Sequence, residues 1–181
     1  MSRKKRPKAP NPFQQAVLNT PGLGGGAYCP GLRALTNKHR ARVKPGEVQI
    51  LGSVNIEQAP HQFYPNKPIW DYAIGVQKGN KPYAIWVEVH PANTSNVSEV
   101  LLKLRWLKEW LSSRATQLHA LTPLQKAYHW IATNEVGISL NSPQARQLAK
   151  AVNRFARDLL NEFADSNSAL DWEKILRFNA G

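Results

Sequence analysis

The stretch Ile69-Trp70-Asp71-Tyr72-Ala73-Ile74-Gly75-Val76 is followed, after Lys78-Gly79-Asn80-Lys81-Pro82, by Tyr83-Ala84-Ile85-Trp86-Val87-Glu88-Val89-His90. Both apolar runs are rich in aromatic and β-branched residues, which favour buried strands. A short polar break that contains glycine between two such runs predicts a β-hairpin. The rest of the fold is predicted outward from this hairpin.

The segments on both sides of the hairpin carry further helix and strand patterns. Helices are expected at residues 30–43, 97–114, 142–163 and 172–178, and strands at residues 48–56, 69–76, 83–90 and 127–133. Residues 136–140 either extend the last strand or pair with it. A hairpin that is followed by a long helix and another strand indicates a mixed sheet flanked by helices.

The helix over residues 97–114 has the clearest pattern. Asn96 is suited to cap it, and Glu99 three residues later completes a capping box. Two apolar stripes run along the helix, one formed by Val100, Leu104, Leu107 and Leu111 and the other by Leu102, Trp106 and Trp110. Two stripes predict a helix that is covered on more than one side, by the sheet and a second helix or by a partner chain.

Length and composition fit one α/β domain. The chain has 181 residues, of which 42% are hydrophobic, and a single cysteine. We expect a disordered basic arm over residues 1–12 and one domain over residues 13–181. No apolar run is long enough to cross a bilayer, so no membrane association is expected. The single cysteine and the lack of a secretory leader favour a cytoplasmic location.

Positive charge is concentrated at the start of the chain. The net charge is +12, and residues 1–46 contain ten lysines and arginines and no acidic residue. Such an excess suits a polyanion, because each neutralised phosphate releases counterions. Nucleic acid is the expected partner, and an acidic protein is the alternative. The candidate contacts for nucleic acid are Arg33, Lys38, Arg40, Arg42, Lys44 and, further along the chain, Lys103.

Two acidic residues lie inside the apolar runs of the hairpin. Asp71 is in the first run and Glu88 is near the end of the second. Burying a carboxylate costs several kcal/mol unless it is paired or bound to a metal. Two carboxylates on adjacent strands, with a backbone carbonyl and water, make an adequate site for a divalent ion. Such an ion would bind a phosphate and activate a water molecule.

His90 follows Glu88 by two residues, so both side chains leave the same face of the strand. A basic group there is suited to orient or deprotonate a water molecule, or to stabilise charge on phosphate. Each residue also has a structural interpretation. Asp71 would bond to nearby backbone amides, Glu88 would pair with Arg105 or Lys103, and His90 would be a hydrogen-bonded residue at a strand end.

An acid on one strand, an acid-x-base pattern on the next and a helix directly after it resemble the PD-(D/E)XK, or restriction-endonuclease-like, superfamily. The matching residues are Trp70-Asp71-Tyr72 and Trp86-Val87-Glu88-Val89-His90-Pro91, followed by the helix from Val97. The resemblance implies an αβββαβ core between about residues 30 and 163. It also implies that Asp71 and Glu88 ligate a metal, that Val89 lends its carbonyl, and that His90 takes the place of the family's lysine.

The chain departs from the family pattern at three positions. Trp70 stands where the family has proline, His90 replaces lysine, and Asn55 is an amide where a third carboxylate is expected. Glu57, or with poorer spacing Glu47, is the candidate for that third acid. Either His90 acts in catalysis or the site has decayed. Lys103 on the next helix could also supply the missing cation from a different backbone position.

The resemblance implies a nuclease that uses Mg²⁺ or Mn²⁺ to hydrolyse phosphodiester bonds, with DNA favoured as substrate. A chain of this size would be expected to act as a homodimer or with another nuclease-like subunit, in phage or plasmid defence or in DNA processing. The first alternative is a catalytically inactive, nucleic-acid-binding or accessory subunit of the same fold. The second is a basic interaction protein that docks an acidic partner.

Overall fold

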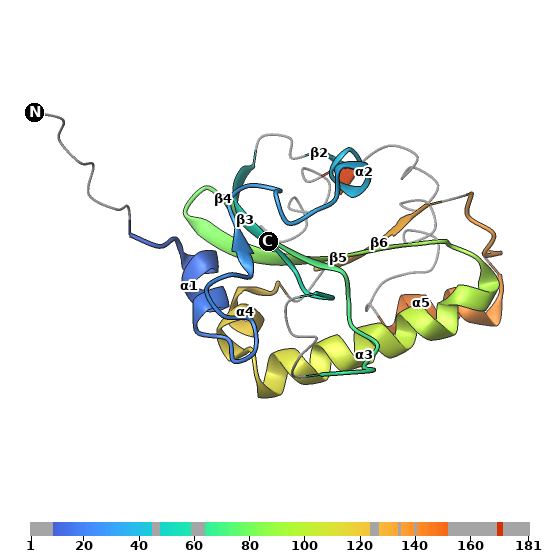
Figure 1. The fold of residues 1–181 in the computed structure, drawn as a ribbon. Helices are drawn as coiled ribbons and strands as arrows, with labels where there is room; N and C mark the ends of the chain where they lie inside the picture. The colour runs from blue at the N-terminus through green and yellow to red at the C-terminus, as the bar shows by residue number, and fades with distance from the viewer. Residues whose placement is uncertain are drawn as a thin grey trace, which may run out of the picture.

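The computed structural model describes residues 9–44, 48–58, 64–123, 127–133, 135–139, 141–151 and 170–171. Its centre is a five-stranded sheet with the order β1-β3-β4-β5-β6. The strands span Tyr28–Cys29 (β1), Gln49–Asn55 (β3), Tyr72–Lys78 (β4), Lys81–His90 (β5) and Tyr128–Ala132 (β6). The first four are antiparallel neighbours, whereas β6 is parallel to β5. The expected α/β domain with a mixed sheet flanked by helices is confirmed (Figure 1).

The predicted hairpin is formed by β4 and β5. Their register runs from Tyr72 opposite Val87 to Lys78 opposite Lys81. The connecting turn contains Gly79 at φ 57°, a left-handed conformation that glycine adopts without strain. β4 begins at Tyr72, so Asp71 lies in the bend directly before the strand and not within it. The hairpin prediction is therefore confirmed, with a later start for its first strand.

The sheet has a different cover on each face. One face packs against helices α1 (Pro12–Leu18), α3 (Val97–Ser113), α4 (Thr116–Leu121) and α5 (Pro143–Ala151) (Figure 1). Side chains alternate along β5, so Ala84 and Trp86 face this helical layer whereas Ile85 and Val87 face the other side. On that other side the apolar residues meet Leu35 and Val43. Glu88 has the parity of Trp86 and therefore faces the helical layer.

The predicted helix over residues 30–43 is wrong. This segment, called the strap below, is a series of turns with one short helix, α2 (Asn37–Arg40). Thr36 interrupts a longer helix because its hydroxyl accepts from the His39 amide and caps α2. Gly31 has φ 59°, which no right-handed helix contains. The strap ends in β2 (Val43–Lys44), which pairs in parallel with β7 (Leu170–Asp171).

Helix α3 confirms the predicted helix over residues 97–114, but its predicted cap is wrong. Asn96 ends the 3-10 helix η1 (Thr94–Asn96), and its side chain makes no capping hydrogen bond. The first apolar stripe is buried as expected. In the second stripe Trp110 is buried and stacks on Trp106, whereas Leu102 is 51% exposed among the described residues.

Helix α1 (Pro12–Leu18) was not predicted, and only its first residue falls within the expected arm over residues 1–12. Asn11 caps this helix through the amide of Gln14, and Pro12 occupies its first position. Its Phe13 ring is fully buried against Gly75 of β4, where a Cβ atom would collide with the ring. A glycine inside a strand thus marks the point at which a helix approaches the backbone closely.

The C-terminal predictions are only partly within the described residues. Helix α5 begins at Pro143, one residue after the start of the predicted helix over residues 142–163, and the Ser142 hydroxyl caps it by accepting from the Ala145 amide. The continuation of that helix to residue 163, the helix at 172–178 and most of the basic arm lie outside the described residues. The prediction that residues 136–140 extend the last strand or pair with it is wrong for the described part of the segment, because β6 ends at Ala132 and Gly137 forms an isolated parallel bridge with Asn93. None of the described helices is long and apolar enough to cross a membrane.

The contact between Gly75 and Phe13 predicts a destabilised Gly75→Ala variant. The added methyl group must displace the Phe13 ring and with it α1, and such overpacking typically lowers the free energy of unfolding by about 1–3 kcal/mol. Urea unfolding is the measurement, with Gly26→Ala as control because no atom lies within 4 Å of its added Cβ. Equal unfolding midpoints for the two variants would contradict this packing.

Candidate active site

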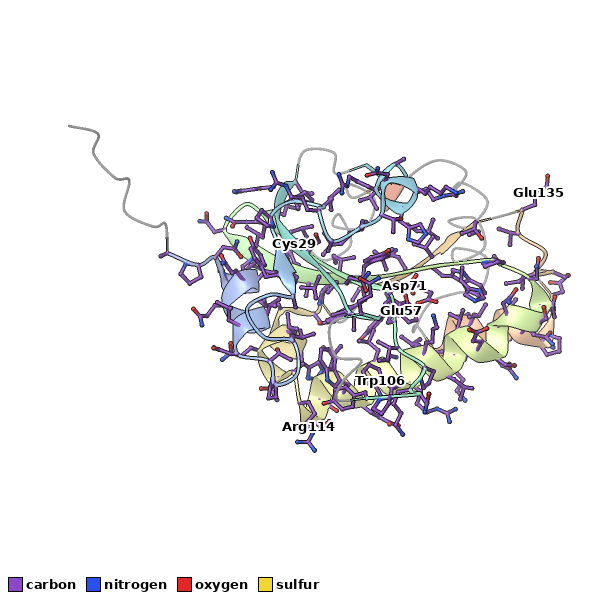
Figure 2. All side chains as sticks on the ribbon, in the orientation of Figure 1. Cys29, Glu57, Asp71, Trp106, Arg114 and Glu135 are labelled. Carbon is purple, nitrogen blue, oxygen red and sulfur yellow. The ribbon has the colours of Figure 1, made fainter. Side chains whose placement is uncertain are left out.

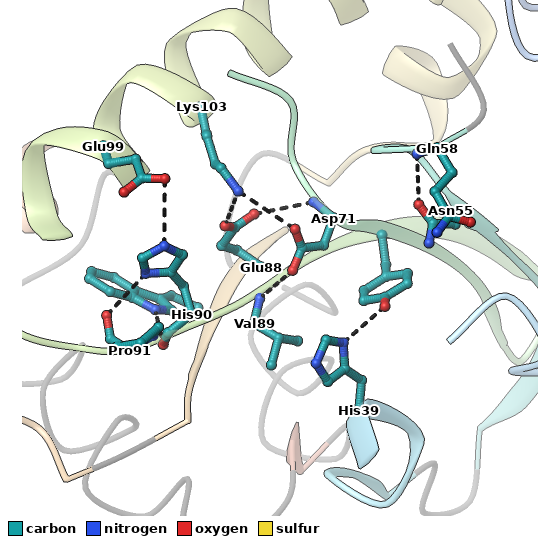
Figure 3. A network of polar contacts seen from close by, with 12 residues as sticks. His39, Asn55, Gln58, Asp71, Glu88, Val89, His90, Pro91, Glu99 and Lys103 are labelled. Carbon is teal, nitrogen blue, oxygen red and sulfur yellow. Dashed lines mark hydrogen bonds and ion pairs between the residues drawn. The ribbon is translucent and has the colours of Figure 1, made fainter. Parts of the chain in front are cut away.

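Three charged side chains meet where β4 begins and β5 ends (Figure 3). Asp71 comes from the bend before β4, Glu88 from β5 and Lys103 from α3. The Lys103 Nζ atom lies 2.5 Å from Glu88 Oε1 and 3.6 Å from Asp71 Oδ1. These residues, called the acid cluster below, lie between the sheet and α3.

Backbone geometry fixes both carboxylates. The ladder between β4 and β5 ends at the pair Tyr72–Val87, and beyond it the two acids replace the backbone pairing. The Asp71 amide donates to Glu88 Oε2 at 3.1 Å, and the Val89 amide donates to Asp71 Oδ2 at 2.9 Å. Each carboxylate therefore accepts a hydrogen bond from the opposite strand with one oxygen and leaves its other oxygen toward Lys103.

The acid cluster is almost closed to solvent. The exposed fractions of the side chains are 0% for Glu88, 11% for Asp71 and 12% for Lys103. Two carboxylates face a single ammonium group, so a fully ionised cluster has an excess negative charge in a poorly hydrated position. Such a charge is expensive unless a proton or a second cation compensates it.

The titration of Glu88 reflects this excess charge. Burial, followed by the neighbouring Asp71 carboxylate, raises the pKa of Glu88 to about 8 against the opposing effect of Lys103. Burial alone would lower the pKa of Lys103, but the charges of Glu88, Asp71 and Glu57 outweigh it and raise that pKa. The cluster thus retains its ammonium group and holds an additional proton more tightly than an isolated glutamate does.

His90 shares the strand face of Glu88, as predicted, but it makes different contacts. Its Nε2 atom lies 3.5 Å from Glu99 Oε1, and its Nδ1 atom lies 3.3 Å from the Pro91 carbonyl oxygen. Glu99 and Lys103 are one turn apart on α3, whereas Glu88 and His90 are two residues apart on β5. The helix therefore places Lys103 over Glu88 and Glu99 over His90, and the ion pairs described for the acid cluster do not include His90 (Figure 3).

Glu57, the candidate third acid, lies close to Asp71 at the end of the sheet (Figure 2). Its amide donates to the Asp71 carbonyl at 3.4 Å, and its side chain is exposed. Among the described residues, no group of three or more His, Cys, Asp or Glu side chains is arranged to hold a metal ion. The alternative candidate, Glu47, lies outside the described residues.

The two carboxylate oxygens that face Lys103 nevertheless suit a divalent ion. Asp71 Oδ1 and Glu88 Oε1 converge on one point, which the Lys103 ammonium group approaches. Carboxylate oxygens are the ligands that Mg²⁺ and Mn²⁺ prefer, and Mg²⁺ is commonly held by one or two carboxylates with water completing its shell. The donor set is thus compatible with a two-carboxylate site that draws its other ligands from water, backbone or substrate.

The predicted nucleic-acid contacts divide into four groups. Arg33 and Lys38 are exposed on the strap. Arg40 donates to the carbonyls of Leu32 and Leu35, and Arg42 donates to the carbonyl of Ala132 at 2.9 Å. Lys103 belongs to the acid cluster. The backbone of Lys44 forms β2, but its side chain lies outside the described residues.

Sequence reasoning missed two polar contacts near the acid cluster. It assigned Glu99 to a helix cap, whereas Glu99 pairs with His90. The signal that could have revealed this pair is the spacing of the charged residues. Glu99 and Lys103 are one turn apart on one helix face, and His90 and Glu88 are two residues apart on one strand face. It made no prediction for His39, whose Nδ1 atom lies 2.9 Å from the Tyr72 hydroxyl. Burial and the Asp71 carboxylate raise the pKa of Tyr72, so this hydroxyl keeps its proton at neutral pH.

Comparison with known proteins adds no relative to this picture, because no family model, no curated protein and no solved structure matches the chain.

The raised pKa of Glu88 predicts that stability depends on pH. The folded protein binds this proton more tightly than the unfolded chain, so the stabilising contribution is complete below about pH 4.3 and is lost as pH rises through about 8. Glu88→Gln replaces the titrating carboxyl group with an amide that does not titrate. The free energy of unfolding of the wild type relative to this variant should therefore fall by more than about 1 kcal/mol between about pH 5 and about pH 9.

Urea unfolding with a chelator present measures this difference. Glu109→Gln, a substitution at an exposed residue of α3, is the matched control and should follow the wild type at every pH. A constant difference between wild type and Glu88→Gln over the whole range would show that the Glu88 carboxyl has an ordinary pKa.

Proposed function

We propose that this protein is a divalent-metal-dependent nuclease that hydrolyses phosphodiester bonds, with DNA as its substrate. The observation that carries the proposal is the convergence of Asp71 Oδ1 and Glu88 Oε1 on one cation position at the end of the hairpin. The order β3, β4, β5, α3, β6, in which η1 and α4 also occur, supports it, because the PD-(D/E)XK superfamily that the sequence resembles has a βββαβ order after its first helix. The helix predicted for that first position, over residues 30–43, is not formed.

Asp71 and Glu88 would hold Mg²⁺ or Mn²⁺ through the oxygens that now face Lys103, with the Val89 carbonyl as a further ligand. When bound, such an ion lowers the pKa of a water molecule and stabilises negative charge on the phosphoryl group. The backbone hydrogen bonds from Val89 and Asp71 prevent the carboxylates from rotating, so the two oxygens stay aimed at the same point. Because Glu88 is protonated more readily than an ordinary glutamate, it must release its proton when it becomes a ligand.

Lys103 on α3 would supply the positive charge of the lysine that the PD-(D/E)XK pattern places at the position of His90 on β5. Its ammonium group already contacts both acids, whereas the His90 ring contacts Glu99 and Pro91. A lysine beside the ligands can orient the attacking water molecule or bind a non-bridging phosphate oxygen. His90 would then act at the edge of the site, where its side chain is 21% exposed.

A second candidate function is a catalytically inactive binding subunit of the same fold. Its support is that all four oxygens of the two acids have a partner within the chain. One oxygen of each acid accepts a backbone amide hydrogen bond, and the other oxygen of each acid contacts Lys103. Both structural interpretations of the sequence, Asp71 on backbone amides and Glu88 paired with Lys103, describe these contacts. An accessory subunit would act with a nuclease-like partner chain, and a homodimer is the corresponding proposal for the active enzyme.

A cleavage assay separates the two functions. Supercoiled plasmid, linear DNA and RNA are incubated with the protein and Mg²⁺, Mn²⁺ or chelator. An active enzyme cleaves DNA only with metal, and Glu88→Gln or Asp71→Asn lowers the rate by at least about 10²-fold, a typical loss for a catalytic group. Glu109→Gln is the matched control and should cleave like the wild type.

Two further variants assign the cation. Lys103→Met should lose activity as Glu88→Gln does, whereas His90→Ala should retain most of it. Large losses in His90→Ala with an active Lys103→Met would reverse this assignment and leave His90 in the lysine role. A folded wild-type protein that cleaves no substrate with either metal would favour the inactive subunit.

A further inference from the structure

The strap crosses the sheet at the end that carries the acid cluster, on the opposite face. The amide of Ala34 donates to the Ser53 hydroxyl of β3 at 3.1 Å, and His39 contacts the Tyr72 hydroxyl of β4. Arg42 reaches the carbonyl of Ala132, which pairs with His90 at the end of β5 and β6. Tyr72 and Ala132 are terminal residues of their strands, and Ser53 lies two residues before the end of β3. The strap is thus fastened across the face opposite to the acid cluster, at the same end of the sheet.

These fastenings leave the positive charge of the strap uncancelled. Arg40 and Arg42 donate to backbone carbonyl oxygens, which carry no net charge. Among the described residues, the ion pairs involve Lys103 and His90, and none involves a cation of the strap. The sequence contains no acidic residue before Glu47. Arg33 and Lys38 point into solvent from a segment whose backbone is held in place.

We propose that the strap is a docking surface for the phosphate backbone of duplex DNA. Arg33 and Lys38 are its phosphate contacts, and Arg40 and Arg42 hold the strap in the shape that presents them. A duplex bound there would lie at the same end of the sheet as the acid cluster, on the opposite face. The inference rests on the proposed function for its choice of DNA, but binding at the strap requires neither metal nor cleavage.

The composition of the strap favours a duplex over a single strand. Proteins that bind single strands stack the bases on aromatic side chains. Residues 30–43 contain no Phe, Tyr or Trp, and the ring of His39 is directed to Tyr72. Fixed cations on a surface without stacking platforms suit the regular phosphates of a double helix, which contribute affinity without sequence preference.

The test compares two double variants that remove the same charge. Arg33→Ala/Lys38→Ala changes the strap, whereas Lys78→Ala/Lys81→Ala changes two exposed lysines of the β4–β5 turn at the opposite end of the sheet. Binding to a short fluorescent duplex is measured in chelator over a series of salt concentrations. The strap variant should bind at least about tenfold more weakly, with a log–log salt slope reduced by about 2, because each lost phosphate contact lowers it by about 0.9. The turn variant should match the wild type.

The outcomes separate this inference from the proposed function. Equal losses in both double variants would show that net charge alone controls binding and would overturn the strap surface. A wild type that does not bind duplex DNA at low salt, or that binds single-stranded RNA more tightly, overturns it as well. Binding that depends on Arg33 and Lys38 supports it even if no variant or metal gives cleavage, in which case only the nuclease proposal fails. Arg33→Glu reverses the charge at an exposed position, so it should weaken duplex binding relative to the wild type without changing the melting temperature.

Discussion

The ion pair of Lys103 with two buried carboxylates is the interaction on which the other features of this protein depend. Asp71 and Glu88 each use one oxygen to terminate the β4–β5 ladder and turn the other toward the helical layer. Without a cation beside them, burying these charged oxygens would cost several kcal/mol of folding free energy. The position of α3 over β5 is therefore fixed by electrostatics as well as by its apolar stripe, since it must bring Lys103 to Glu88 and Glu99 to His90.

The two faces of the sheet have complementary electrostatic characters at this end. On the helical side, two carboxylates share one ammonium group, and the excess negative charge raises the pKa of Glu88. On the other side, the strap carries cations whose hydrogen bonds go to neutral carbonyl groups. A divalent ion would bind on the negatively charged side, and a polyanion would bind on the positively charged side.

Local patterns predicted the elements whose side chains alternate or repeat clearly. The hairpin, the strand containing Gly52, α3 and β6 follow from apolar alternation and from helical spacing, and Asp71 and Glu88 stood out because acids are rare in such runs. The helix predicted over the strap is wrong because tertiary contacts of Leu35 and Val43, together with the Thr36 cap, favour turns over the helix that the local sequence suggested. The choice between His90 and Lys103 as partner of the acids depends on how α3 lies over β5, which no local pattern encodes.

Calorimetric titration with Mn²⁺ tests the central claim most directly, because it requires neither substrate nor turnover. If Asp71 and Glu88 form the cation site, the wild type binds Mn²⁺, Glu88→Gln binds at least about tenfold more weakly (about 1.4 kcal/mol), and Glu109→Gln binds as the wild type does. Lys103→Met should bind more tightly, since its ammonium group competes for the same two oxygens. Absence of binding to the wild type, or equal affinity in Glu88→Gln, would contradict the account and leave the acid cluster as a structural ion pair.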